Sequence, residues 1–141
     1  MFSTKSIIIA FIAATAGLTS ALPRGQESHL DQAVPRAAAT SGDLTHYDVG
    51  AGFGACGQMH SNSELVVAID PTTYGNDPNP NNSKQCGRSI RVKYGGKSAV
   101  VKVVDKCPGC KTGDLDLSPA AFKQVVGDLG IGRVRGTWDW I

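Results

Sequence analysis

The stretch VVDKCPGCKTGDLDLS, residues 103–118, contains two groups that could do chemistry: a CxxC motif and a pair of aspartates. Asp114 and Asp116 alternate with leucines, so on a strand both carboxylates would share one face while Leu115 and Leu117 enter the core. A carboxyl group on such a face can act as a general acid. The same alternation is also typical of an ordinary strand with a polar outer face.

The CxxC motif, Cys107 and Cys110, fits a disulfide, half of a zinc site or a redox centre. The chain has 4 cysteines, and an even number in an oxidising compartment indicates disulfides. Zinc would need Cys56 and Cys86 as the second ligand pair, and these lie far apart in the sequence without a second CxxC. A redox centre would need a helix beginning at the first cysteine, whereas Pro108–Gly109 predicts a turn. We favour two disulfides and no metal site.

The N-terminus indicates the compartment. Residues 1–21 combine an early lysine, a short apolar run and small residues at the cleavage position, which is the pattern of a secretory signal peptide. The run is shorter than the roughly 20 residues that span a bilayer, and no second one follows, so we expect a secreted protein with no membrane partner. Residues 22–41 carry two Pro-Arg pairs and predict a flexible pro-segment or linker. The compact domain is expected over 42–141.

The charge of the chain argues against nucleic acid as the partner. Its formal net charge is +2, and lysines and arginines form no run or stripe. A neutral polysaccharide or a protein surface is the more consistent partner. The polar loop 71–84 contains one glycosylation sequon, Asn81-Asn82-Ser83, which suits the surface of a secreted chain.

Short alternating runs dominate the domain and predict strands over residues 44–48, 65–70, 89–94, 99–104 and 133–140. Gly95–Gly96 separates two of these runs and predicts a hairpin. One helix is signalled, because Ser118 is a suitable N-cap and Pro119 suits the first helical position. Short strands, many glycines and one short helix in a small domain predict an all-β fold of the barrel type.

Four segments together resemble a known family: GACG at 54–57, QCGRSIRV at 85–92, VVDKC at 103–107 and DLDLSPAAFKQV at 114–125. They resemble the double-psi β-barrel of expansins and of bacterial rare lipoprotein A, and most of all the small secreted fungal relatives called loosenins. The resemblance implies a six-stranded barrel with an open groove that takes a polysaccharide chain. We expect a monomer without a cofactor. The sequence ends before the second domain of expansins, so we expect weak affinity for any one polymer.

The resemblance also implies roles for individual residues. Asp116 matches the aspartate that is essential for wall loosening in expansins and the general acid of the related family 45 endoglucanases. Thr45, Tyr47 and Asp105 match groove residues of the family. Asp114 stands where plant expansins have a histidine, and we place it in the groove as well.

The family further implies a disulfide between Cys56 and Cys86, and therefore a second one between Cys107 and Cys110. Catalysis is less well supported. The endoglucanases place their base two residues after the tyrosine that matches Tyr47, whereas Asp48 follows it directly. A slip of one residue on a strand moves a side chain to the other face, so the base is doubtful.

Three functions remain open at this point. The first is binding and non-hydrolytic loosening of cell-wall polysaccharide, whether cellulose, chitin or a β-glucan. The second is an enzyme, a glycoside hydrolase or lytic transglycosylase that uses Asp116 as general acid. The third is inhibition of a papain-like cysteine protease, which some secreted bacterial barrels of this family perform.

Overall fold

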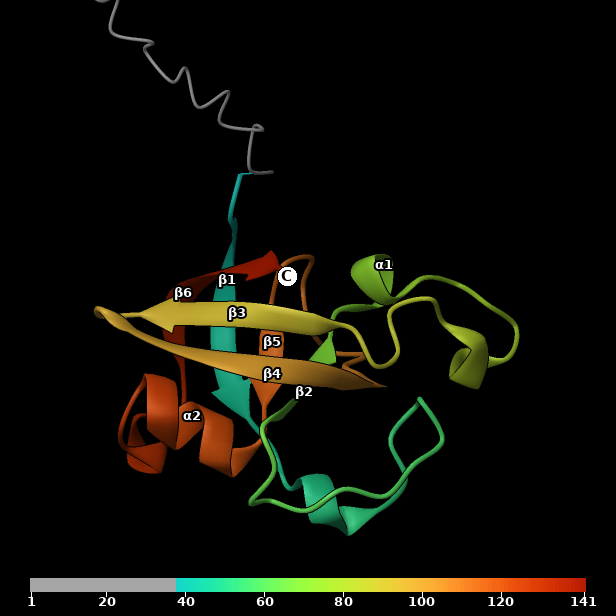
Figure 1. The fold of residues 1–141 in the computed structure, drawn as a ribbon, viewed down its shortest axis with the longest axis horizontal. Helices are drawn as coiled ribbons and strands as arrows, with labels where there is room; N and C mark the ends of the chain where they lie inside the picture. The colour runs from blue at the N-terminus through green and yellow to red at the C-terminus, as the bar shows by residue number, and fades with distance from the viewer. Residues whose placement is uncertain (1–37) are drawn as a thin grey trace, which may run out of the picture. The chain divides into compact units, whose positions relative to one another are not determined.

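The computed structural model describes residues 38–141, so the expected signal peptide and residues 22–37 of the expected linker lie outside the described part. Six strands form the fold: β1 Thr40–His46, β2 Val66–Ile69, β3 Ser89–Tyr94, β4 Lys97–Lys106, β5 Leu115–Leu117 and β6 Val134–Trp140. They close into a barrel in the order β1-β5-β2-β4-β3-β6 (Figure 1). The prediction of an all-β, six-stranded double-psi barrel is confirmed.

The barrel mixes parallel and antiparallel pairs. β1 runs parallel to β5 and β2 runs parallel to β4, while all the other neighbours are antiparallel. The hairpin of β3 and β4 turns at Gly95 and Gly96, whose φ angles are +54° and +80°. Positive φ at both central residues is what a tight type I′ hairpin requires, and glycine adopts it without strain. The hairpin prediction is therefore confirmed.

Strand β1 begins earlier than the sequence indicated. Thr40 and Ser41, assigned to the linker, pair with Trp138 and Thr137 of β6. Their side chains lack the alternation that identified the other strands, and the pairing with β6 extends the strand beyond the apolar residues. The barrel therefore starts at Thr40, within the predicted linker.

The core lies inside the barrel and under one helix. Ten apolar side chains of the strands and of the helix are each at most 1 % exposed: Val67, Ile69, Ile90, Val92, Val101, Val103, Leu115, Leu117, Phe122 and Val125. Full burial of such a side chain contributes about 1.5–3 kcal/mol. Trp138 joins this core at 2 % exposure, and its indole nitrogen donates a hydrogen bond to Gly113 O at 2.8 Å. The buried indole therefore leaves no unpaired donor.

Among residues 38–141, two α-helices lie outside the barrel wall, together with three 3₁₀ turns, η1 Val49–Ala51, η2 Pro80–Asn82 and η3 Leu129–Ile131. The predicted helix is α2, Pro119–Val125, and Ser118 caps it by accepting a hydrogen bond from Ala121 N at 3.2 Å. The second helix, α1, is a single turn, Pro71–Tyr74, in the segment that we expected to be a loop.

Helix α1 forms because Asp70 caps it. The Asp70 side chain is fully buried and accepts hydrogen bonds from Thr73 N at 2.9 Å and from the Thr73 hydroxyl at 2.6 Å. Pro71 then occupies the first helical position, where its missing N–H costs nothing. The sequence carried this Asp-Pro signal, but the run of polar turn residues that follows it obscured the helix.

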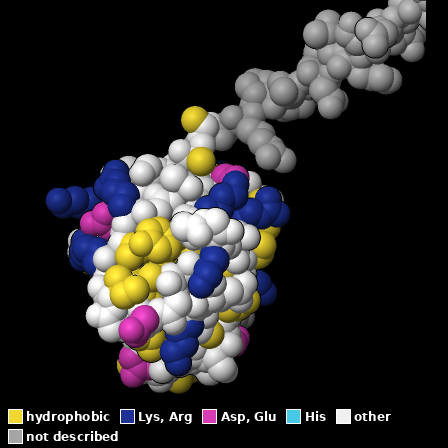
Figure 2. Space-filling model, turned by 90° about the vertical axis from the view of Figure 1, so that its left-hand side faces the viewer, with side chains coloured by type: hydrophobic (Ala, Val, Ile, Leu, Met, Phe, Trp, Pro, Cys, Tyr) yellow, Lys and Arg dark blue, Asp and Glu magenta, His cyan; other side chains and the backbone are white. Residues whose placement is uncertain are grey.

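On the face drawn in Figure 2, charged side chains are scattered. Figure 2 shows one face, on which lysine and arginine side chains surround a small hydrophobic area without forming a stripe. Among residues 38–141, no helix is long and apolar enough to cross a membrane.

Candidate functional site

Four neighbouring strands place three polar residues in one row. Thr45 of β1 lies opposite Asp116 of β5, Asp116 lies opposite Ala68 of β2, and Ala68 lies opposite Asp105 of β4. Residues directly opposite each other share a face of the sheet. Leu115 and Leu117, on either side of Asp116, are fully buried. The row therefore lies on the outer face of the barrel.

A β-bulge brings Asp105 onto this face. Under regular alternation Asp105 would share the inward direction of Val103, which is fully buried. The register shifts between Val67 and Ala68, however, so that Val103 faces Val67 while Asp105 faces Ala68. Bulges insert one residue into a strand and re-aim the side chains that follow. The extra residue is Val104, and Asp105 points outward because of it.

Asp116 is partly buried and has a single side-chain partner, the Thr45 hydroxyl, which donates to it at 2.8 Å. Burial raises the pKa of Asp116 above its ordinary value, and the charge of Asp105 raises it further, while the Thr45 hydrogen bond opposes both. A carboxyl group with a raised pKa keeps its proton to higher pH and can then donate as well as accept hydrogen bonds.

Asp105 accepts more hydrogen bonds within the protein than Asp116 does. Its carboxylate accepts hydrogen bonds from the Tyr47 hydroxyl at 3.2 Å, from Ala55 N at 2.7 Å and from Lys106 N at 2.8 Å. Burial raises the pKa of Tyr47, and the charge of Asp105 adds to this, so the phenol stays neutral and keeps donating. A carboxylate has about four acceptor positions, so Asp105 retains about one for a ligand.

Two hollows open at the ends of the row. The first, which we name the Asp116 hollow, has a volume of about 250 Å³. It is bounded by β1, by β5 and by the loop that contains Cys107 and Cys110. Its lining includes Asp43, Thr45, Asp114, Asp116 and Arg133. The second, the Phe53 hollow, has a volume of about 280 Å³. It is lined by residues of the loop after β1 and by Tyr47 and Asp105.

The other carboxylates that line the two hollows already form hydrogen bonds or ion pairs within the protein. Asp114, expected in the groove, does line the Asp116 hollow, but it is 9 % exposed and accepts backbone hydrogen bonds from Asp43 N at 2.8 Å and Lys111 N at 3.0 Å. Asp43 is ion-paired with Arg133 at 2.9 Å. These bonds hold the turn before β5 and the start of the barrel, so both aspartates serve the fold.

Asp48, the doubtful base, lies in the Phe53 hollow and does not line the Asp116 hollow. Its Oδ1 accepts hydrogen bonds from Gly50 N at 3.1 Å and from Asn62 Nδ2 at 2.9 Å. Asp48 thereby caps η1 and has no position beside Asp116.

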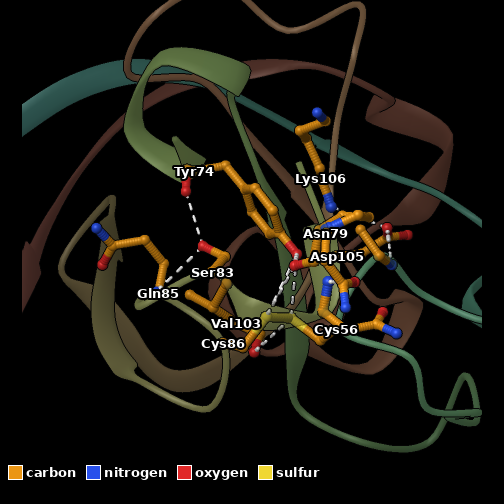
Figure 3. The surroundings of a disulfide bond; sticks show 12 residues. Cys56, Tyr74, Asn79, Ser83, Gln85, Cys86, Val103, Asp105 and Lys106 are labelled. Carbon is orange, nitrogen blue, oxygen red and sulfur yellow. Dashed lines mark hydrogen bonds between the residues drawn. A yellow bond between two sulfur atoms is a disulfide. The ribbon is translucent and has the colours of Figure 1, made fainter. Parts of the chain in front are cut away.

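Both expected disulfides are present, Cys56–Cys86 and Cys107–Cys110. Figure 3 shows the first one, with the Tyr74 hydroxyl pointing at its sulfur atoms. This hydroxyl lies 3.3 Å from the sulfur of Cys86 and donates a hydrogen bond to Pro80 O at 2.7 Å. The bridge therefore ties the loop after β1 to the loop after α1. Within the described residues, no three His, Cys, Asp or Glu side chains group as metal ligands would.

Comparison with known proteins decides the family. A family model described as lytic transglycolase, the model of RlpA-like double-psi β-barrels, matches residues 39–135. The chain belongs to the RlpA-like double-psi β-barrel family. This RlpA-like barrel is similar to the papain inhibitor of Streptomyces mobaraensis, at 37 % identity over 135 residues that cover 94 % of this chain and 89 % of the inhibitor.

Solved structures agree with that assignment. A Streptomyces papain inhibitor superposes with a TM-score of 0.67 at 39 % identity, covering 76 % of this RlpA-like barrel chain and 97 % of the inhibitor. A mutant of an expansin of Clavibacter michiganensis, solved in complex with cellohexaose, superposes with a TM-score of 0.61 at 28 % identity. That match covers 73 % of this chain and 50 % of the expansin, so the barrel corresponds to half of that protein.

The sequence analysis did not identify Phe53 of this RlpA-like barrel, which lines its own hollow and is 76 % exposed. The only signal was an aromatic residue next to the GACG motif, and an isolated phenylalanine in a loop does not indicate a site. His46 follows Thr45 at the end of β1. Its ring packs against Phe122 at 4.9 Å between centroids, and its Nε2 hydrogen-bonds with Leu129 O at 3.0 Å. Asn81 is exposed, and its glycosylation stays a prediction.

The raised pKa of Asp116 gives this RlpA-like barrel a testable pH dependence. The folded state holds the Asp116 proton to higher pH than the unfolded chain, whose ordinary value is 3.8, so ionisation lowers the free energy of unfolding as pH rises through the folded-state pKa. Asp116→Asn is expected to match the wild type in acid and to be more stable near pH 7, with the difference opening above about pH 4. Urea unfolding of both proteins across this range measures it. An Asn variant that is less stable at neutral pH would contradict the expectation.

Proposed function

We propose that this protein binds a neutral, β-linked cell-wall polysaccharide along the outer row and loosens it without hydrolysis. We also propose that residues 1–21 direct its secretion, because two disulfides suit an oxidising compartment. The polysaccharide is expected to contact Asp116, Thr45, Tyr47 and Asp105.

The observation that supports this proposal most directly is the small number of hydrogen-bond partners of the Asp116 carboxyl group. It is the carboxyl group of the row with one side-chain partner and a raised pKa, whereas Asp105 accepts from three donors. Inverting hydrolysis needs a second, free carboxylate about 6.5–9.5 Å from the acid, with room for a water between them. Asp43, Asp48 and Asp114 are all held by ion pairs or backbone N–H groups.

Loosening needs only an exchange of hydrogen bonds. A typical hydrogen bond contributes about 0.5–1.5 kcal/mol net in water, because its partners can bond elsewhere. A partly protonated Asp116 can donate to one sugar hydroxyl and accept from another, while the Thr45 hydroxyl can turn from Asp116 to the sugar. Hydroxyls that joined two polysaccharide chains would then be satisfied by the protein instead. The cellohexaose bound by the Clavibacter expansin supports a glucan as the class of ligand.

Inhibition of a papain-like cysteine protease is a second candidate. The specific observation is the similarity to the Streptomyces papain inhibitor, which extends over 94 % of this chain. A closed barrel with a protruding loop is compatible with that role as well as with glycan binding.

The decisive experiment incubates the secreted protein with insoluble cellulose and with chitin, and measures bound protein and released sugar in the same tubes. Binding to one polymer without sugar release above background is the expected result. Release of reducing sugar, or of anhydro-sugar ends, would replace loosening by a hydrolase or a lytic transglycosylase. Failure to bind either polymer, together with inhibition of papain at stoichiometric concentration, would establish the second candidate instead.

A further inference from the structure

Phe53 is exposed in a way that the fold does not explain. It is the most exposed of the large hydrophobic side chains in the described part of the chain, at 76 %. It also borders a hollow that contains Tyr47, Asp48 and Asp105. We propose that the Phe53 hollow is a second sugar subsite, in which the Phe53 ring stacks on a pyranose ring of the polysaccharide. This inference rests on the proposed function and extends the site beyond Asp116.

The loop that carries Phe53 is held in place by its backbone. Phe53 and Met59 form an antiparallel bridge, and Gly54 N donates to Gln58 O at 3.0 Å. A Cβ atom at Gly54 would lie 2.4 Å from Val104 O, so only glycine lets the loop approach β4 this closely. The ring is therefore presented on a rigid support, which limits the conformational entropy that a ligand must overcome.

The same loop connects directly to the row. Ala55 N donates to the carboxylate of Asp105 at 2.7 Å, and Cys56 N donates to Val104 O at 3.2 Å. The Cys56–Cys86 disulfide closes the loop from the other side. Phe53 is thus fixed relative to Asp105, which is itself in register with Asp116.

The chemistry of the hollow fits a sugar better than an apolar side chain. Ligand sites combine apolar or aromatic walls with a few placed polar groups, and a pyranose presents apolar C–H faces and a rim of hydroxyls. Here the aromatic ring stands beside the exposed carboxylate of Asp48 and the Tyr47–Asp105 pair. A hydrophobic peptide side chain in this hollow would bury those polar groups without new hydrogen bonds, which is costly. Sugar hydroxyls would give the exposed carboxylate of Asp48 new hydrogen-bond partners.

The row sets the length of chain that the site can hold. Asp116 and Asp105 lie in register with one strand, β2, between them. Since neighbouring strands are about 4.8 Å apart, their Cα atoms are separated by about 10 Å. A polysaccharide chain that lies along the row reaches both hollows only if it has several sugar residues. Affinity should therefore rise with chain length until both hollows are filled.

The test compares Phe53→Ala, Phe53→Trp and the wild type in binding to cellohexaose and chitohexaose and to the matching trisaccharides, by NMR titration. Phe53→Ala is expected to bind the hexasaccharide about 3- to 10-fold more weakly, the range of one aromatic contact, and to lose the preference for hexasaccharide over trisaccharide. Phe53→Trp should retain both. Ile131→Ala is the matched control, because Ile131 is 52 % exposed on η3 and lines neither hollow.

The outcomes separate this inference from the proposed function. If the wild type binds none of the four oligosaccharides, both the glycan function and the subsite are overturned. If the wild type prefers the hexasaccharide and Phe53→Ala keeps that preference, the subsite is wrong while the function stands. If Phe53→Ala loses inhibition of papain but binds sugar like the wild type, Phe53 is a protein-docking residue and the subsite is overturned.

Discussion

Replacement of Asp116 by asparagine is expected to abolish wall loosening while the barrel folds and is secreted normally. Asparagine keeps the shape of the side chain and can still accept the Thr45 hydrogen bond, which is 2.8 Å long in the wild type. It removes the titrating proton and the negative charge, and its amide has one fixed donor group and one fixed acceptor group in place of a carboxyl group that can change between the two roles at either oxygen. The measurement is the mechanical weakening of filter paper or of a chitin film, together with circular dichroism of the purified variant.

Asp77→Asn provides the matched control. Asp77 is exposed on the loop after α1 and lines neither the Asp116 hollow nor the Phe53 hollow, so its charge can be removed without touching the row. This variant should loosen like the wild type. Normal loosening by Asp116→Asn would exclude Asp116 from the mechanism.

Removal of the Cys56–Cys86 disulfide, by serine at both positions, is expected to lower the free energy of unfolding by about 3–4 kcal/mol. The bridge joins residues 30 positions apart, and such a crosslink restricts a long loop of the unfolded chain. Domains of this size have total stabilities of about 5–15 kcal/mol, so the loss is a large share. Urea unfolding followed by tryptophan fluorescence measures it, since Trp138 is buried in the core.

The second disulfide provides the comparison. Cys107 and Cys110 are separated by only 3 positions, so serine at both should cost only about 2 kcal/mol. The Cys56–Cys86 variant should in addition lose glycan affinity. Without the disulfide, the loop that contains Ala55 is no longer fixed, so its N–H no longer holds the Asp105 carboxylate in place. Equal costs for the two pairs would show that loop length does not determine the contribution of these bridges.

Much of the barrel could be predicted because its strands alternate regularly. Ile90 and Val92 are fully buried while Arg91 between them is not, and the residues of β5 follow the same rule. The hairpin at Gly95–Gly96 and the Ser118 cap of α2 were also predicted, since both depend on local residue types. Each of these signals depends on a few neighbouring residues of the sequence. It can therefore be recognised without knowing which distant segments those residues contact.

The parts that the sequence did not reveal depend on contacts between distant segments. Alternation alone directs Asp105 into the core, and only the family resemblance placed it in the groove; the physical reason is the bulge opposite Ala68. Asp114 alternates with leucines in the sequence as Asp116 does. Its carboxylate nevertheless accepts hydrogen bonds from the backbone N–H groups of Asp43 and Lys111. Neither outcome follows from residue types, because each depends on how β4 and the turn before β5 meet their neighbours.

The closed strand order restricts how a protein partner could bind. Within residues 38–141 each of the six strands is paired with a neighbour on both sides over part of its length, so no strand is an edge strand throughout. Many proteins recognise peptides by adding them as a strand to such an edge, and exposed edges also promote aggregation. Where a strand is paired on both sides, a protease or any other protein must recognise loops and outward side chains instead. A peptide that bound as an additional strand at such a segment would first have to break the ladder between two strands of the barrel.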